Sequence, residues 1–234
     1  MRYPILILLP LFLFSCDPKD FQKILDAANQ QTLTNTDMAN GLKDALGLGV
    51  ENGVQTLSAN NGYYQSVYKI LLPDEAKKVI DKLKFIPGFT DLEEKAIQKI
   101  NQAAEDAAKS ASPIFTKAIK DMTFNDALSI LMGEKNAATN YLHQKTYQSL
   151  YGQFNPVIVQ SMNKFGALTL WSDAIKKYNS IPFVDKINPD LGDHVTNRAL
   201  EGLFDLIEKK ELGIRTNISQ RTSDLLRRVF AKQD

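Results

Sequence analysis

Apolar residues recur at helical spacing along most of this chain. Residues 36–59 carry one apolar stripe, and the turn-forming sequence Asn60-Asn61-Gly62 ends it. Between Pro73 and Pro87 the apolar positions follow the i, i+3, i+4, i+7 spacing of an amphipathic helix. Two further stripes cover residues 195–207 and 225–230. The pattern predicts an all-α fold.

Prolines, glycines and capping residues mark the boundaries between these helices. Thr90 with Glu93, and Thr123 with Asp126, have the spacing of a capping box at a helix start. Pro113 ends or restarts a helix between these two boxes. Gly133 is placed to end the helix that follows Thr123. Further helices are predicted over residues 136–151, 156–164 and 168–178.

Only Ser66 to Leu72 has a composition that favours an extended segment. The sequence shows no internal repeat and no linker rich in proline or serine after residue 36. We therefore predict that residues 36–234 form a single multi-helix bundle with short connections bounded by proline or glycine, and with at most one short extended segment.

The first fifteen residues have the features of a signal peptide. Arg2 gives a positive start, and the apolar run from Ile5 to Phe14 is too short to span a bilayer, so a transmembrane anchor is the weaker interpretation. The run ends in Leu13-Phe14-Ser15-Cys16, which resembles the lipobox of bacterial lipoproteins. The sequence predicts that residues 1–15 are removed and that Cys16 is lipidated. The alternative is a signal peptide with an incidental cysteine.

Cys16 is the only cysteine in the chain, which excludes an internal disulfide and a metal site built on several cysteines. A single acyl chain binds a membrane only marginally, whereas the two or three chains of a mature lipoprotein hold firmly. Residues 16–35 are polar, with a weak helical pattern, and are interpreted as a lipidated tether. We expect a lipid-anchored protein of the bacterial cell envelope, facing the periplasm, on either the inner or the outer membrane.

The charge balance argues against nucleic acid as a partner. The full chain has 28 basic and 27 acidic residues, and removal of residues 1–15 takes away only Arg2, which leaves 27 of each. Nucleic-acid-binding proteins usually carry an excess of positive charge on one face.

Motifs for cofactor or metal binding fail on their spacing or context. Gly47, Gly49 and Gly53 approach a dinucleotide fingerprint, but the last spacing is one residue too long and no strand precedes them. Close helix packing explains these glycines better. His143 and His194 are the only histidines, and neither has other metal ligands nearby in the sequence. We predict neither a metal nor a cofactor.

A group of polar residues is the main candidate for a site. Asn101 and Glu105 lie one turn apart at the edge of an alanine-rich stripe, so both could face a partly buried space. A buried glutamate needs a partner, and Arg215 or Arg221, with Thr222 next to it, could supply one. Solvated positions and helix capping are the alternatives.

Short motifs are spread along nearly the whole mature chain. They are Gly41 to Leu46, Leu71-Leu72-Pro73, Asn101 with Ala103-Ala104-Glu105, Asp126-Ala127 before Ile130-Leu131 and Gly133, Ala137-Ala138-Thr139 with Tyr141 and Thr146, Phe154 with Pro156, Ala199 to Phe204, Arg215, Arg221-Thr222 and Leu225 to Phe230. Together these motifs resemble the domain of unknown function 4197 family, a set of bacterial envelope proteins that often carry a lipoprotein signal. The resemblance implies a helical fold and an envelope location, and implies no established activity. The family's motifs include Asn101, Glu105, Thr139, Arg215 and Arg221.

Two functions remain open from the sequence. The first is a non-catalytic envelope lipoprotein whose helical domain presents a surface or groove to a protein, peptide or lipid partner. The alternative is a hydrolase-like envelope enzyme with a site around Glu105, His143 and Arg221, in which Thr139 could also take part. No nucleophile-elbow motif supports the enzyme. The enzyme requires these side chains to converge in one cleft, whereas the non-catalytic protein does not.

Overall fold

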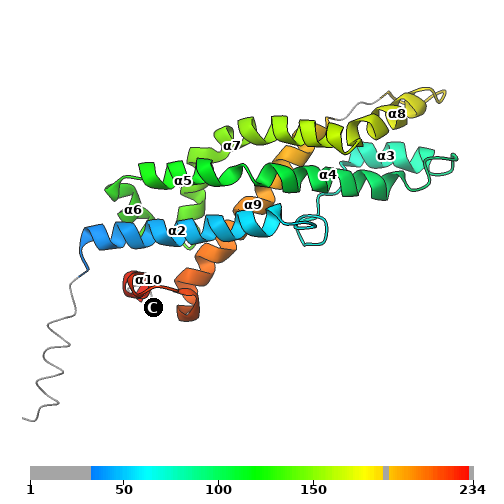
Figure 1. Cartoon of the computed structure of the whole chain (residues 1–234). Helices are drawn as coiled ribbons and strands as arrows, with labels where there is room; N and C mark the ends of the chain where they lie inside the picture. Colours follow the sequence, from blue (N-terminus) through cyan, green and yellow to red (C-terminus); the bar gives the residue numbers. More distant parts are fainter. Residues whose placement is uncertain (1–32, 187–189, 232–234) are drawn as a thin grey trace, which may run out of the picture. The chain divides into compact units, whose positions relative to one another are not determined.

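The computed structural model describes residues 33–186 and 190–231, and all regular secondary structure in this part of the chain is helical (Figure 1). The predicted all-α bundle is confirmed. Residues Asn35–Asp234 form one compact unit by their internal contacts. The predicted signal peptide, and all but the last three residues of the predicted tether, lie outside the described residues.

The helices of this part of the chain are α2 (Asn35–Ser58), α3 (Asp74–Leu83), α4 (Leu92–Ala108), α5 (Ala111–Asp121), α6 (Phe124–Leu131), α7 (Ala137–Lys164), α8 (Ala167–Asn179), α9 (Leu191–Thr216), the short 3₁₀ helix η1 (Ile218–Gln220) and α10 (Asp224–Phe230). Most connections between the helices are short, but residues 59–73 separate α2 from α3 and residues 180–190 separate α8 from α9.

The three long helices α2, α7 and α9 form the centre of the bundle. The helix α9 packs against both α7 and α2 and runs obliquely across them (Figure 1). A fourth helix, α4, packs along α7. On α4 the side chains of Ala103, Ala104, Ala107 and Ala108 are completely buried. Because a methyl group takes little space, these alanines let the neighbouring helices approach closely, and dense packing of this kind stabilises the core.

The glycines of α2 serve helix packing at two of the three expected positions. A methyl group on Gly49 would meet Ile207 of α9 at 3.8 Å, and one on Gly53 would meet Leu203 at 3.4 Å. For Gly47 the expectation is wrong, because no atom lies within 4 Å of such a methyl group. The three glycines lie within a continuous helix, which is not the strand-turn-helix context of a dinucleotide site.

The prediction of separate helices on either side of Pro156 is wrong. The helix α7 runs without interruption from Ala137 to Lys164, with Pro156 inside it. Proline lacks the N–H that would bond to the carbonyl of Gly152, and Pro156 lies on the exposed face of the helix. Buried residues on both sides of the proline, such as Phe154 and Ile158, keep the helix packed through this point.

One of the two predicted capping boxes forms. Thr123 Oγ1 accepts from the N–H of Asp126, and the Asp126 carboxylate accepts from the N–H of Thr123, which confirms the box before α6. The box at Thr90 is wrong, since α4 starts after Asp91, whose side chain makes no cap hydrogen bond. The carboxylate of Asp91 instead forms an ion pair with Lys95, at 2.6 Å.

The stretch from Ser66 to Leu72 contains turns as far as Tyr68 and then runs without helix or strand to Pro73. The predicted extended segment is thus irregular, and it pairs with side chains of α4 rather than with another strand. Among the described residues, no helix combines the length and the apolar character needed to cross a bilayer.

Candidate functional site

Glu105 of α4 binds the backbone of the turn that follows α2. Its carboxylate accepts hydrogen bonds from the N–H groups of Asn61, Tyr63 and Tyr64, at 3.2, 3.3 and 3.3 Å. The turn needs this support because Asn61 has a left-handed backbone, with φ of 62°. Burial raises the pKa of the Glu105 carboxyl group, and the backbone hydrogen bonds from Asn61 and Tyr63 oppose that effect.

Asn101, one turn before Glu105, holds the irregular segment that leads to α3. Its side-chain oxygen accepts from the N–H of Ile70 at 2.8 Å, and its nitrogen donates to the carbonyl of Ile70 at 2.9 Å. The same nitrogen donates to the carbonyl of Ile97, at 2.7 Å. The fully buried amide therefore pairs with Ile70 much as a neighbouring strand would, and satisfies backbone groups that have no helix to bind them.

A second buried network joins α9 to the corner between α6 and α7, and it centres on Glu211. The Glu211 carboxylate accepts from the N–H groups of Ala138 and Thr139, at 3.0 and 2.8 Å, and from Thr139 Oγ1, at 2.8 Å. These are amides of the first turn of α7, where the partial positive charge of the helix end favours an anion. Glu211 acts as a cap supplied by another helix.

Arg215, one turn after Glu211, binds the other side of the same corner. Its guanidinium donates to the carbonyls of Leu131 and Ile130, at 3.1 and 3.0 Å, where α6 ends. It also forms an ion pair with Glu211 at 2.9 Å, and both side chains are buried. A cation therefore binds the carbonyl end of α6 while an anion binds the amide end of α7, so two residues of α9 fix the direction of both helices.

Arg221 lies after α9 and closes the carbonyl end of that helix. Its guanidinium donates to the carbonyls of Ile214 and Arg215, at 3.0 and 3.1 Å, and the residue is 2 % exposed. Thr222 next to it is exposed, and Ser223 is the residue that caps α10. Arg221 therefore fixes the reversal of the chain between α9 and α10.

The polar residues singled out from the sequence thus fall into two places. Asn101 and Glu105 hold the segment between α2 and α3, while Thr139, Arg215 and Arg221 hold the ends of α6, α7 and α9. The expected pairing of Glu105 with an arginine is corrected: Glu105 binds backbone amides, and the partner of Arg215 is Glu211. The cavity beside Glu211 and Arg215 measures about 10 Å³, which is the space of a single water.

Sequence reasoning missed Glu211 and Tyr63. Glu211 and Arg215 stand four residues apart on a helix, the spacing at which opposite charges meet, and that signal was available. Tyr63 is fully buried and donates from its hydroxyl to the carbonyl of Ala199 at 2.7 Å, which ties the segment held by Glu105 to α9. Burial and the nearby Glu105 raise the pKa of the Tyr63 hydroxyl, which keeps it a donor.

The two histidines take part in packing and in a loop contact. His143 is exposed on α7, and its ring lies against Tyr147 and Phe204 with centroid distances of 4.8 and 4.7 Å. His194 Nε2 lies 2.8 Å from the carbonyl oxygen of Leu71. In the part of the chain that the structure describes, no group of three or more histidine, cysteine or acidic side chains is arranged to hold a metal ion.

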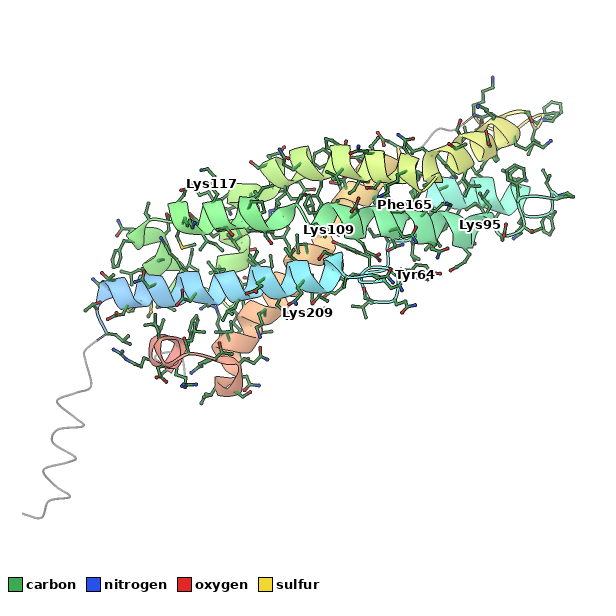
Figure 2. All side chains as sticks on the ribbon, viewed as in Figure 1. Tyr64, Lys95, Lys109, Lys117, Phe165 and Lys209 are labelled. Atoms are coloured by element: carbon green, nitrogen blue, oxygen red, sulfur yellow. The ribbon has the colours of Figure 1, made fainter. Side chains whose placement is uncertain are left out.

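Two hollows open on the surface between α5 and α7. One has a volume of about 540 Å³, and a neighbouring one of about 480 Å³ shares Pro113, Ile114 and Ser149 with it, so the two form a continuous groove. Ile114, Ala118 and the buried Thr146 are among the residues that line it. Charged side chains also line it: Lys117 (labelled in Figure 2), Asp121, Asp126 and Lys145.

Hydrogen bonds fix much of this charged border. Lys117 and Asp121 form an ion pair on α5. The Asp126 carboxylate accepts from Thr123, and this bond lowers the pKa of the Asp126 carboxyl group, which keeps it ionised. Lys145 lies 5.7 Å from the centre of the Tyr141 ring. The groove is therefore lined by a few apolar side chains, among them Ile114 and Ala118, together with charged groups of both signs.

A second surface hollow, of about 430 Å³, lies between the segment from Val67 to Leu72 and the start of α9. His194, Arg198 and Glu201 line it from α9. The segment that forms its other wall is the one that Asn101 holds in place.

Comparison with known proteins gives a family and no function. A search of curated proteins found no match, and neither did a search of solved structures. A family model described as "Protein of unknown function (DUF4197)" matches residues 32–231, which includes every helix described above. The chain therefore belongs to this family of proteins of unknown function.

Proposed function

We propose that this protein is a non-catalytic lipoprotein of the bacterial envelope whose helical domain binds an apolar segment of another envelope protein in the groove between α5 and α7. The anchor in this proposal is Cys16, the sole cysteine, at the end of a leader with the features of a lipoprotein signal. The proposal places the binding domain outside the cytoplasm and on a membrane surface.

The groove carries the proposal. Its volume lies in the range of protein sites that bind small ligands or short segments, and its walls belong to two helices that pack directly against each other. Ile114 and Ala118 offer apolar contact in the groove. Lys145 could orient a partner that carries an acidic side chain beside its apolar ones, whereas Lys117 already pairs with Asp121.

The buried polar residues support a function at the surface. Glu105, Glu211, Arg215 and Arg221 each bind backbone groups of neighbouring segments, and those bonds hold the fold. A side chain already engaged in this way would have to release a buried backbone group before it could act on a ligand, at a cost of about 1–3 kcal/mol for each group.

The hydrolase-like alternative gains no support from the positions of its three candidates. Glu105 binds the turn after α2, Arg221 binds the carbonyl end of α9, and His143 lies exposed against aromatic rings on α7 and α9. A general base needs to lie within hydrogen-bond reach of the group it activates, and these residues contact different parts of the chain. We do not propose this activity.

A photo-crosslinking amino acid placed at Ala118, which lines the groove, tests the proposal in intact cells. We expect a discrete crosslinked product with one envelope protein, and we expect Lys145→Glu to reduce it severalfold. The matched control places the same amino acid at Gln160, an exposed position farther along α7. No product at residue 118, or equal products at residues 118 and 160, would contradict the proposed groove.

A further inference from the structure

Two connections of the bundle are apolar where loops are ordinarily polar. The loop after α3 reads Phe85-Ile86-Pro87-Gly88-Phe89, and the loop after α8 reads Ile181-Pro182-Phe183-Val184. Neither run contains a charged residue. Phe85 is 82 % exposed and Phe183 is 108 % exposed, so both side chains lie largely in solvent. Exposed apolar residues that are grouped rather than scattered commonly mark an interaction surface.

The two loops lie at the same end of the bundle. The helices α3 and α8 pack against each other, and in Figure 1 the C-terminal ends of both point to the same side. Pro87, Pro182 and the two phenylalanine rings are exposed, while Ile86, Phe89, Ile181 and Val184 are partly exposed. We call these eight residues the apolar tips. The prolines restrict the backbone, so little conformational freedom remains to be lost when the tips bind.

The backbone at Phe183 adds a second observation. This residue has a φ of 63°, in the left-handed region that favours glycine and asparagine. Phenylalanine is therefore unfavourable there on two grounds, because the backbone is strained and the ring gains nothing from the protein's own core. Contact with a molecule outside this chain would explain a phenylalanine at this position, because the folding of the protein itself does not.

Lysines flank both loops, but the surrounding charge is close to balanced. Lys84 forms an ion pair with Asp81, and Lys176 forms one with Asp173. Lys84 also lies 5.4 Å from the centre of the Phe85 ring. Long lysine side chains beside aromatic rings suit the boundary between lipid headgroups and acyl chains. Because acids pair with these lysines, binding would depend on the apolar side chains more than on net charge.

We propose that the apolar tips insert into the headgroup region of a lipid bilayer and form a second membrane contact for the anchored protein. The proposal rests on the proposed function in one respect: the tether through Cys16 holds the protein at a membrane, although it joins the bundle at the start of α2, away from the tips (Figure 1). Two phenylalanines bind lipid weakly on their own, but a tether converts the contact into an intramolecular event with a high effective concentration.

A bilayer fits this surface better than a folded protein partner does. Rings that stand out from the surface would need matching pockets in a protein, whereas a fluid lipid surface adapts to them. Turn hydrogen bonds already satisfy part of the loop backbone, from Ile86 N to the carbonyl of Leu83 and from Phe89 N to that of Ile86. The remaining free backbone groups limit insertion to the headgroup region, where water and polar atoms are available.

The test uses the single cysteine, so that it does not depend on natural lipidation. The chain from Cys16 onward is coupled through that thiol to a maleimide lipid in zwitterionic vesicles that contain brominated lipid, a quencher of tryptophan fluorescence. Phe183→Trp and Phe85→Trp are made separately, and the signal of the parent, which contains only the buried Trp171, is subtracted. We expect each new tryptophan to shift to shorter wavelength and to lose most of its emission, at low and at high salt.

Met132→Trp is the matched control, because Met132 is 71 % exposed and lies in the connection between α6 and α7. We expect no quenching there. Absence of quenching at both residue 85 and residue 183 would overturn the proposal, and so would equal quenching at residue 132 or quenching that vanishes at high salt. Because the lipid is attached chemically, these outcomes test membrane contact by the apolar tips alone. The mass of the native protein separately tests the natural lipid anchor.

Discussion

Glu211 and Arg215 show how two side chains can organise a corner between helices. Glu211 binds the amide end of α7 and Arg215 binds the carbonyl end of α6, and the two also pair with each other. Each charge is buried, so each depends on the other and on the helix ends for the interactions it loses from water. The corner should therefore be sensitive to the loss of either charge.

Glu211→Gln should lower the free energy of unfolding by about 3–5 kcal/mol, because it leaves the Arg215 charge buried without its partner and weakens the cap of α7. Urea denaturation followed by circular dichroism measures this change. The control is Glu208→Gln, on the same helix but exposed, which should change stability by less than about 0.5 kcal/mol. Equal effects of the two substitutions would contradict the role given to Glu211.

Asn101→Asp should destabilise the protein by about 1–3 kcal/mol, although the two side chains have nearly the same shape. The nitrogen that donates to the carbonyls of Ile70 and Ile97 becomes an oxygen, so two buried acceptors lose their donor. Amide hydrogen exchange at Ile70 should also become faster. Gln102→Glu, on the next residue and only partly buried, is the control, and unchanged exchange in the Asn101 variant would refute the pairing.

The sequence indicates which of these residues are buried more clearly than it indicates their partners. Asn101 and Glu105 stand at the edge of an apolar stripe, so helical periodicity alone suggests burial. Their partners are backbone groups of an irregular segment some 30 to 45 residues earlier in the chain, which no side-chain pattern reveals. An arginine partner was expected for Glu105 because a buried negative charge is often paired with a positive one. In the structure three backbone N–H groups stabilise the Glu105 carboxylate instead.

At the scale of helices, α7 shows why boundaries are harder to predict than helices themselves. The sequence correctly predicts helix on both sides of Pro156. The local rule that proline ends a helix then divides this single helix into two in the prediction. Contacts with α4 and α9 hold α7 in place, and they outweigh the loss of one backbone hydrogen bond. The Thr123 box forms while the Thr90 box does not, since Asp91 rather than Thr90 is the residue that precedes α4.

Pro156→Ala should raise the free energy of unfolding by about 1–3 kcal/mol. The substitution restores an N–H to the helix interior and removes an exposed ring that makes no core contact. Thermal unfolding measures the gain. Pro113→Ala is the control, because Pro113 is equally exposed but stands in the first turn of α5, where proline is tolerated and no gain is expected. Destabilisation by Pro156→Ala would mean that the proline is required for the packing of α7.

The cap of α6 should weaken in acid. The hydrogen bonds from Thr123 lower the pKa of the Asp126 carboxyl group below its ordinary value of 3.8, so the folded state binds this proton less readily than the unfolded state. Its contribution to stability is present above pH 3.8 and is lost as the pH falls further. Asp126→Ala should therefore lower the Tm more at pH 7 than at pH 3, and an equal loss at both pH values would contradict this role.

At the scale of the whole molecule, the buried polar groups of the described bundle bind backbone groups and hold the structure. The all-α fold follows from the periodicity of the sequence, and the family match covers the same residues. The groove between α5 and α7 and the apolar tips were not predictable from periodicity, because each combines residues from separate helices or loops. We propose both surfaces as binding sites of a protein held at a membrane by Cys16.

The intact mass of the protein purified from its native membranes tests this account most directly. We predict a chain that begins at Cys16 and carries a diacylglyceryl group on its thiol, with or without a further acyl chain on its amino group. A mass that includes residues 1–15, or a Cys16 without lipid, would contradict the proposed anchor and remove the basis for placing the groove at a membrane surface.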